Sequence, residues 1–143
     1  MKIVCQILQA KNNNVVSITP GSYVYNGLEL MVEKNVSSLL VIENDELLGI
    51  FTERDYARKV ILKGKASRET LISEIMTKEL ITVTPDTTVD ECMRIMTSKF
   101  IRHLPVIDHG KLTGVVSIGD LLKHTIEDQK FIIENLEQFI TGK

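Results

Sequence analysis

Apolar and polar positions follow two different rhythms along this chain, and the same order of rhythms occurs twice. The segments 15–20 and 80–85 are short β-branched runs that end at Pro, a pattern typical of a strand halted by a turn. Apolar residues then recur at steps of three and four, starting from Val24 in one segment and from Val89 in the other. Each of these stripes predicts one amphipathic helix with a core-facing side.

Two apolar runs joined by polar residues follow each predicted helix, at 36–51 and at 101–116. This pattern predicts a hairpin whose second strand ends at a hydroxyl residue. A second helix is expected to begin there, at Thr52 or at Ser117. The predicted order is therefore β-α-β-β-α in each copy.

The two copies are related by sequence as well as by pattern. When positions 15–56 are aligned with 80–121 without a gap, eleven pairs of residues are identical. Unrelated segments of this length and composition share roughly two or three, so a duplication explains the agreement. Neither copy alone can cover both faces of its small sheet, and we expect an α+β fold in which the two repeats pack on each other.

The repeats define the expected division of the chain. Residues 1–62 form the first repeat, and residues 63–70, which are polar and lack an apolar period, form a linker. Residues 71–127 form the second repeat, which opens with a short helical turn. Residues 128–143 are expected to extend its last helix.

This extended C-terminal helix has an apolar stripe with a period near 3.5 residues, interrupted by Gln129. The stripe comprises Leu122, Ile126, Ile133, Leu136 and Ile140. The helix either folds back on its own domain or contacts a second chain, and the sequence favours neither.

Composition excludes several classes of function. The 143 residues carry a formal net charge of −2 with no basic block, which gives a nucleic-acid partner little electrostatic support. No apolar run reaches the roughly 20 residues that span a bilayer, and the N-terminus lacks a signal-peptide pattern, so we expect a cytoplasmic protein with no membrane partner. Cys5 and Cys92 lie far apart without a metal-binding motif, which favours two buried thiols with no chemical role.

The pattern with the most chemical content is GIFTERD at 49–55, which returns as GVVSIGD at 114–120. The spacing of hydroxyl and Asp is that of a helix capping box, and such a cap is the simplest interpretation of either copy. A helix N-terminus also leaves backbone donors that support polar recognition. The carboxylates of Asp55 and Asp120 are suited to accept hydrogen bonds from vicinal hydroxyls such as those of ribose.

A phosphate next to such a carboxylate needs cations nearby. The second copy offers Arg102 and His103 at the start of its central strand, where the first copy has Ser37 and Ser38. The alternative is that Arg102 and His103 are an ordinary solvated arginine and surface histidine.

The duplicated unit, the TP after its first strand, the LPVID strand and the G-h-x-[ST]-x-x-D pattern together resemble the cystathionine-β-synthase (CBS) domain. Two such domains in tandem form a Bateman module, and the resemblance covers essentially residues 1–127. It implies two repeats related by pseudo-twofold symmetry and a regulatory sensor of adenine nucleotides. It also implies a stand-alone protein that pairs into a homodimer and acts on an unidentified effector.

The resemblance also implies roles for individual positions. The final Asp of each pattern, Asp55 or Asp120, holds the ribose hydroxyls, and the hydroxyl residue Thr52 or Ser117 lies near the phosphate or ribose. Arg102 and His103 hold phosphate, while Ser37 and Ser38 weaken that expectation for the Asp55 site. The adenine is expected against the central strand of the opposite repeat, at Val36 for the Asp120 site and Ile101 for the Asp55 site, with Val16 and Ile81 closing the pockets.

Two hypotheses of different classes follow. The first is a regulatory module that requires no cofactor and binds AMP, ADP, ATP or NAD in the clefts between its repeats. The second is a structural or protein-interaction module whose clefts are vestigial. An enzyme has little support, because the three histidines form no metal-ligand spacing and neither GxSxG nor a P-loop occurs.

Overall fold

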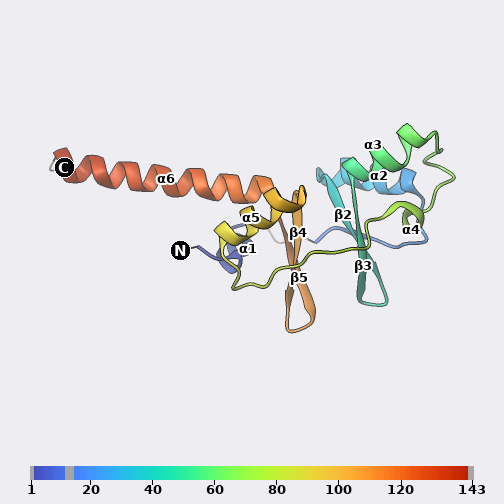
Figure 1. Ribbon diagram of the computed structural model, residues 1–143, viewed down its shortest axis with the longest axis horizontal. Coiled ribbons are helices and arrows are strands. Elements are labelled where there is room, and N and C mark those ends of the chain that lie inside the picture. Colours follow the sequence, from blue (N-terminus) through green and yellow to red (C-terminus); the bar gives the residue numbers. More distant parts are fainter. Residues whose placement is uncertain (1, 12–14, 142–143) are drawn as a thin grey trace. The chain divides into compact units, whose positions relative to one another are not determined.

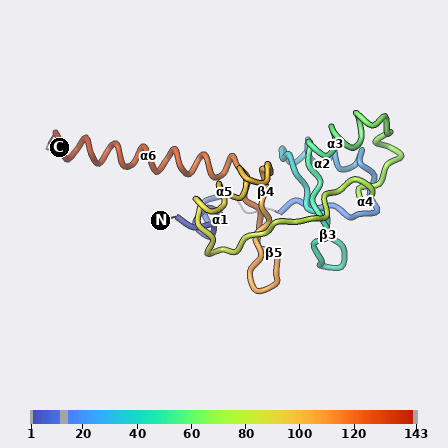
Figure 2. Tube along the Cα trace, in the orientation of Figure 1, coloured from blue at the N-terminus to red at the C-terminus, as the bar shows by residue number. Residues whose placement is uncertain are grey.

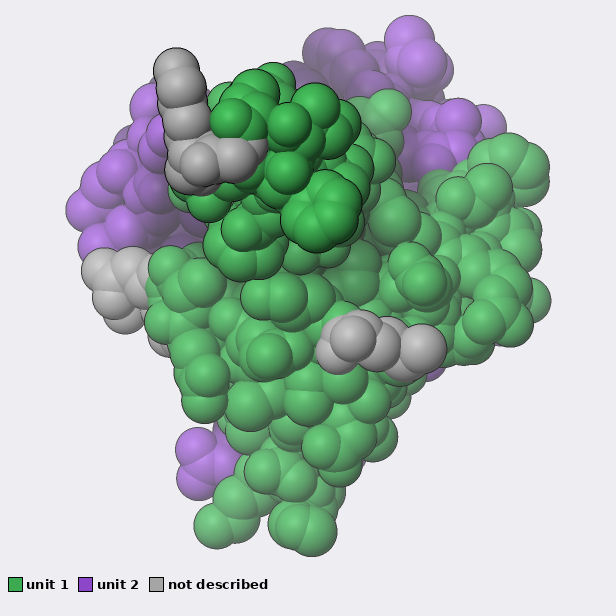
Figure 3. All heavy atoms as spheres, turned by 90° about the vertical axis from the view of Figure 1, so that its left-hand side faces the viewer, with its two compact units in different colours: residues 1–13, 82–143 green, residues 14–81 purple. Residues whose placement is uncertain are grey.

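The computed structural model describes residues 2–11 and 15–141 and divides the chain into two compact units. Unit 1 combines residues 1–13 with 82–143, and unit 2 is formed by residues 14–81 (Figure 3). The compact units therefore do not follow the sequence repeats. Each unit takes the segment that precedes the other repeat in the chain.

Unit 2 contains a three-stranded sheet in the order β1-β2-β3, in which β1 and β2 are parallel and β2 and β3 antiparallel. Its elements in chain order are β1 (Ser17–Ile18), α2 (Val24–Lys34), β2 (Ser38–Glu43), β3 (Glu46–Thr52), α3 (Glu53–Lys59), the 3-10 turn η1 (Ile61–Lys63) and α4 (Ile72–Ile75). This is the predicted β-α-β-β-α order followed by the predicted short helical turn.

The core of unit 2 lies between the sheet and its helices. It is formed by the side chains of Val24, Met31, Leu39, Val41, Phe51, Val60, Ile72 and Ile75. The first two come from the predicted stripe of α2. The last two come from α4, so the segment that opens the second repeat completes the core of the first.

Unit 1 contains the antiparallel pair β4-β5 and three helices. Its elements are α1 (Val4–Ala10), α5 (Val89–Lys99), β4 (His103–Asp108), β5 (Lys111–Ser117) and α6 (Ile118–Thr141). Both hairpins of the chain close with two-residue loops of positive φ, at Asn44–Asp45 and at His109–Gly110, as a type I′ turn requires.

The strand expected at 80–85 is reduced to a single parallel bridge between Val83 and Val106. In unit 2 the corresponding strand is held partly by the Leu40 N–H, which donates to the Val16 carbonyl at 3.1 Å. The residue equivalent to Leu40 in the second repeat is Pro105, which has no N–H to donate. The second copy therefore loses one hydrogen bond of this ladder.

Helix α1 was not predicted from the sequence, and it folds with the second repeat (Figure 2). Its side chains Val4, Ile7 and Leu8 are buried, and the Val4 N–H donates to the Thr87 carbonyl at 2.9 Å. Helix α4 docks in the same way on the first repeat, where the Ile72 N–H donates to the Ser22 carbonyl at 2.8 Å. Ser22 and Thr87 are equivalent positions in the two repeats. Helices α1 and α4 therefore dock at equivalent positions, each on the repeat that it does not belong to in sequence.

Helix α6 continues the second helix of the repeat without a break, so the expected extension at 128–143 belongs to one 24-residue helix. Residues 142–143 lie outside the described part of the chain. Leu121 is buried in unit 1, whereas the later apolar side chains are exposed, and this part of α6 projects from the rest of its unit (Figure 1). The interpretation in which this helix folds back on its own domain is therefore wrong. In the described residues, no helix has the length and apolar character needed to cross a bilayer.

Candidate functional site

Both copies of the seven-residue pattern lie where a strand passes directly into a helix, at β3–α3 and at β5–α6. In the first copy the Asp55 N–H donates to Thr52 Oγ1 at 3.1 Å, and the Thr52 N–H donates to Asp55 Oδ2 at 3.0 Å. The second copy has the same reciprocal pair between Ser117 and Asp120, at 3.1 and 2.9 Å. The capping interpretation is confirmed for both copies.

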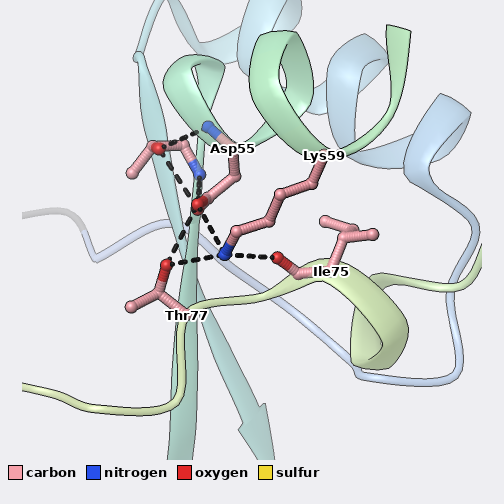
Figure 4. Close-up of polar contacts among 5 residues, drawn as sticks. Asp55, Lys59, Ile75 and Thr77 are labelled. Carbon is pink, nitrogen blue, oxygen red and sulfur yellow. Dashed lines mark hydrogen bonds and ion pairs between the residues drawn. The ribbon is translucent and has the colours of Figure 1, made fainter. Parts of the chain in front are cut away.

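The carboxylate of Asp55 makes further bonds inside unit 2 (Figure 4). The Thr77 hydroxyl donates to Asp55 Oδ1 at 3.0 Å, and Lys59 Nζ lies 3.1 Å from the same oxygen. Lys59 also donates to the Ile75 carbonyl at 3.1 Å. Both oxygens of Asp55 therefore have partners within the unit, and its side chain is only 9% exposed.

Gly49 allows the segment after α4 to reach this network. A Cβ at Gly49 would lie 2.8 Å from the Thr77 carbonyl oxygen and 3.0 Å from Met76 Sδ. The Ile50 N–H and the Thr77 carbonyl form a hydrogen bond of 3.0 Å, and the reverse pair measures 2.9 Å. The glycine of the pattern thus serves close packing of backbone, which in turn places the Thr77 hydroxyl on Asp55.

Asp120 has a different surrounding in unit 1. Lys11, which caps the C-terminus of α1, places its Nζ 2.8 Å from Asp120 Oδ2 and 2.9 Å from the Val115 carbonyl. The side chain of Asp120 is 24% exposed, well above the value for Asp55. Burial alone would raise the pKa of Asp120, but the hydrogen bonds from Lys11 and Ser117 and the charge of Lys11 hold it below its usual value. The carboxylate is therefore ionised and partly accessible.

The exchange of helices explains why Asp120 has a lysine from outside its own repeat. In the first repeat the cation is Lys59, four residues after Asp55 on the same helix. The equivalent position after Asp120 is His124, whose Nε2 is buried with no hydrogen-bond partner among the described residues. Asp120 instead receives its cation from α1.

Two further basic residues lie at the start of β4, near this carboxylate. His103 pairs with Ser117 in the register of β4 and β5, and the Arg102 carbonyl accepts the Ile118 N–H at 2.9 Å. The pKa of His103 is lowered from its usual value chiefly by burial, and also by the charges of Lys11 and Arg102, while Asp120 acts in the opposite direction. His103, Arg102, Lys11 and Asp120 are thus close enough to interact electrostatically.

The described residues hold no group of three or more acidic, histidine or cysteine side chains that could bind a metal ion. Burial, helped by the neighbouring Glu91, raises the pKa of the Cys92 thiol to about 11, which keeps it protonated and unreactive near neutral pH. Cys5 is partly exposed, so the expectation of two buried thiols is correct for Cys92 alone.

Comparison with known proteins identifies this arrangement. A family model described as CBS domain matches residues 7–62 and matches again at 72–127. The chain belongs to the CBS domain family. Tandem CBS domains generally act as regulatory, ligand-binding modules.

Relatives share the whole tandem pair of CBS domains. The CBS domain-containing protein CBSX3, mitochondrial, of Arabidopsis thaliana is 41% identical over 129 residues, which are 87% of this chain and 63% of that protein. A solved CBS-domain structure from Burkholderia ambifaria is 47% identical, with a TM-score of 0.87 over 90% of this chain and 96% of its own. The hexameric CBS-CP12 protein from bloom-forming cyanobacteria is 32% identical, with a TM-score of 0.75 over 84% of this chain and 66% of its own.

The residues that the sequence predicts for a ligand site are divided between the two units. Unit 1 brings together Arg102, His103, Ser117 and Asp120, with Ile101 two residues before β4. Unit 2 contains Thr52 and Asp55 together with Val16, Val36 and Ile81, and the first two of these apolar residues pack against its core. The expected pairing of Val36 with the Asp120 site, and of Ile101 with the Asp55 site, stays a prediction.

Sequence reasoning missed Lys11, Lys59 and Thr77. Lys59 could have been found, because it lies one helical turn after Asp55 and such pairs meet on a helix surface. Lys11 and Thr77 could not, because each reaches its carboxylate from a segment that belongs to the other repeat in sequence.

Proposed function

We propose that this CBS pair is a regulatory module that binds an adenine nucleotide, AMP, ADP, ATP or an NAD-type ligand, at the cleft built on Asp120. The observation that supports the proposal is an ionised, partly exposed carboxylate with three basic side chains around it. A carboxylate accepts from ribose hydroxyls, and cations at a short distance neutralise phosphate.

In this proposal the phosphate is bound by three basic side chains, those of Lys11, Arg102 and His103. Arg102 is exposed and offers a planar fork of donors, whereas Lys11 is a point charge already beside Asp120. Ser117 supplies a hydroxyl at the N-terminus of α6, where the helix dipole also favours anions. Val36, from the other repeat, is the proposed contact of the adenine, and Val16 closes the pocket.

The cleft built on Asp55 is proposed to bind nucleotide weakly or not at all. Ribose could reach this carboxylate only by replacing bonds from Thr52, Thr77 and Lys59. Ser37 and Ser38 bring no charge for a phosphate. We therefore propose that the cleft lined by Ile101 and Ile81 retains the helix cap of Thr52 and Asp55 but does not bind a ligand.

We further propose that the working form is a homodimer in the cytoplasm that passes the state of its nucleotide site to an effector protein. The hexameric CBS-CP12 relative shows that a related CBS pair assembles into an oligomer. The location rests on the sequence alone, and the Arabidopsis relative is named as mitochondrial.

A thermal-shift screen against AMP, ADP, ATP, NAD and S-adenosylmethionine tests the proposal. A nucleotide at a hundred times its dissociation constant stabilises the folded chain by about 2.7 kcal/mol, and Asp120→Ala should abolish the shift. A 2′,3′-dideoxy form of the best ligand should bind more weakly by roughly 1 to 3 kcal/mol, because an acceptor is left unmatched.

The second candidate is the interaction module with empty clefts, and the exposed apolar face of α6 favours it. If none of the five compounds shifts the melting temperature, the nucleotide proposal is contradicted and the interaction module is the remaining candidate. The two candidates therefore separate in a single screen.

A further inference from the structure

Helix α6 carries an apolar face that the described part of the chain leaves uncovered. Its members are 48 to 88% exposed and comprise Leu122, Ile126, Ile132, Ile133, Leu136, Phe139 and Ile140. At 3.6 residues per turn these side chains lie within one arc of roughly 140°. A monomeric protein seldom exposes a continuous apolar surface of this kind, which marks an interaction site.

The spacing within this face has a defined heptad phase. Successive steps of four and three place isoleucine at each a position, Ile126, Ile133 and Ile140. The d positions are Leu122, Gln129 and Leu136. Isoleucine at a with leucine at d is the combination that favours two parallel helices in a coiled coil.

Gln129 also favours the parallel arrangement over the antiparallel one. In a parallel, in-register pair Gln129 meets the same residue of the other helix, and each side-chain amide can donate to and accept from its partner. An antiparallel pair that places Leu122 opposite Ile140 puts Gln129 against Ile133, which leaves a buried amide unmatched.

The charges beside the seam do not decide between the two arrangements. The e positions are Lys123, Lys130 and Glu137, and the g positions are Thr125, Ile132 and Phe139. A parallel pair brings e positions against g positions, so no two like charges meet. The antiparallel pair brings e against e, which places Lys130 close to its own copy but also sets Lys123 opposite Glu137 at two positions, so repulsion and attraction oppose each other. The parallel arrangement is therefore favoured by Gln129 and by the isoleucines at a and leucines at d.

An anionic membrane surface is a poor partner for the same helix. From Ile118 to Thr141 it carries five acidic side chains, Asp120, Glu127, Asp128, Glu134 and Glu137, against the two lysines Lys123 and Lys130. Helices that lie on membranes have a polar face rich in Lys and Arg, which attracts anionic lipid. The acidic face of α6 is repelled by such a surface.

We propose that a second copy of this chain covers the apolar face, and that the two α6 helices form a parallel, in-register coiled coil from Leu122 to Ile140. The seam from Leu122 to Ile140 takes up about 27 Å of the 24-residue helix. The pairing is independent of nucleotide binding.

Disulfide trapping in the 143-residue chain tests the register directly. Ile140→Cys places a thiol at an a position, and a parallel pair brings the two thiols within disulfide reach. An antiparallel pair would separate them by roughly 27 Å along the helix axis. Phe131→Cys, on the opposite face of α6 and 65% exposed, is the matched control, and the wild-type chain reports any background from Cys5.

We expect mild oxidation to convert most of the Ile140→Cys chain to a covalent dimer and to leave Phe131→Cys and the wild type as single chains. Light scattering should give twice the chain mass of 16.1 kDa. Ile133→Asp should weaken that dimer roughly tenfold or more, because it buries a charge in the seam, while Phe131→Asp should not.

Equal trapping at positions 140 and 131, or a dimer that Ile133→Asp leaves unchanged, would overturn the proposal. Trapping only in a mixture of Leu122→Cys with Ile140→Cys would show an antiparallel pair and overturn the parallel one. A wild-type chain that is monomeric at micromolar concentration would overturn both.

Discussion

The two aspartates of the repeated pattern, Asp55 and Asp120, show how one motif takes different roles through its neighbours. Both cap a helix through the same reciprocal hydrogen bonds. Asp55 is closed by Thr77 and Lys59 from its own unit, while Asp120 faces a lysine and stays partly exposed. The carboxylate is enclosed by the protein in one copy and partly exposed in the other.

This contrast predicts unequal losses of stability for the same substitution at the two positions. Asp55→Asn removes an ionised acceptor from a buried network and should lower the free energy of unfolding by about 1 to 3 kcal/mol. Asp120→Asn should cost less, because water can reach that side chain. Urea unfolding measures both, and an Asp120→Asn variant at least as destabilised as Asp55→Asn would contradict this assignment.

His103 gives the proposed site a dependence on pH. Because its pKa in the free protein is below the usual 6.5, the imidazole is neutral at pH 7.5 and gains a proton as the pH falls. A phosphate beside it favours the protonated form, so AMP affinity should rise as the pH falls.

Calorimetric titration at pH 7.5, 6.5 and 5.5 measures this trend. His103→Gln controls for the titration of the phosphate itself, whose second pKa is about 6, and adenosine controls for effects without phosphate. If wild type and His103→Gln show the same pH profile, His103 does not contact the phosphate.

At the level of elements, strand β3 and the segment after α4 depend on a glycine at their contact. Gly49→Ala would bring a Cβ into the Thr77 carbonyl and Met76, and the forced backbone shift should cost roughly 1 to 3 kcal/mol. Gly21→Ala is the matched control, because nothing lies within 4 Å of the added atom. Equal melting temperatures of the two variants would show that the contact of Gly49 with Thr77 and Met76 accommodates a Cβ without loss of stability.

The elements also show what sequence reasoning can and cannot reach. The helices α2 and α5 and both hairpins were predicted, because their apolar periods and turn residues are local. The weak first strand of the second repeat depends on Pro105, whose missing N–H matters only once its partner strand is known. The packing of helix α1 and the contact of Lys11 with Asp120 both result from the exchange of segments between the repeats. This exchange brings together residues far apart in sequence, so no local pattern predicts it.

On the scale of the whole molecule, that exchange makes each unit incomplete without part of the other repeat. A fragment of residues 71–143 lacks α1 and its buried Val4, Ile7 and Leu8, and a fragment of residues 1–70 lacks α4 with Ile72 and Ile75. We expect neither fragment to unfold cooperatively alone, and an equimolar mixture to recover a cooperative transition in circular dichroism. A fragment that unfolds alone at the temperature of the intact chain would show that the exchanged helix contributes little.

We propose that an adenine nucleotide binds at the cluster of Asp120, Lys11, Arg102 and His103. Calorimetric titration of AMP into the wild type, Asp55→Asn, Asp120→Asn and Lys11→Met tests it most directly. We expect one site per chain, near-normal affinity for Asp55→Asn, and at least a roughly tenfold loss for Asp120→Asn and Lys11→Met, since each removes a charge-assisted hydrogen bond. Loss of binding in Asp55→Asn, with Asp120→Asn and Lys11→Met unchanged, would contradict it.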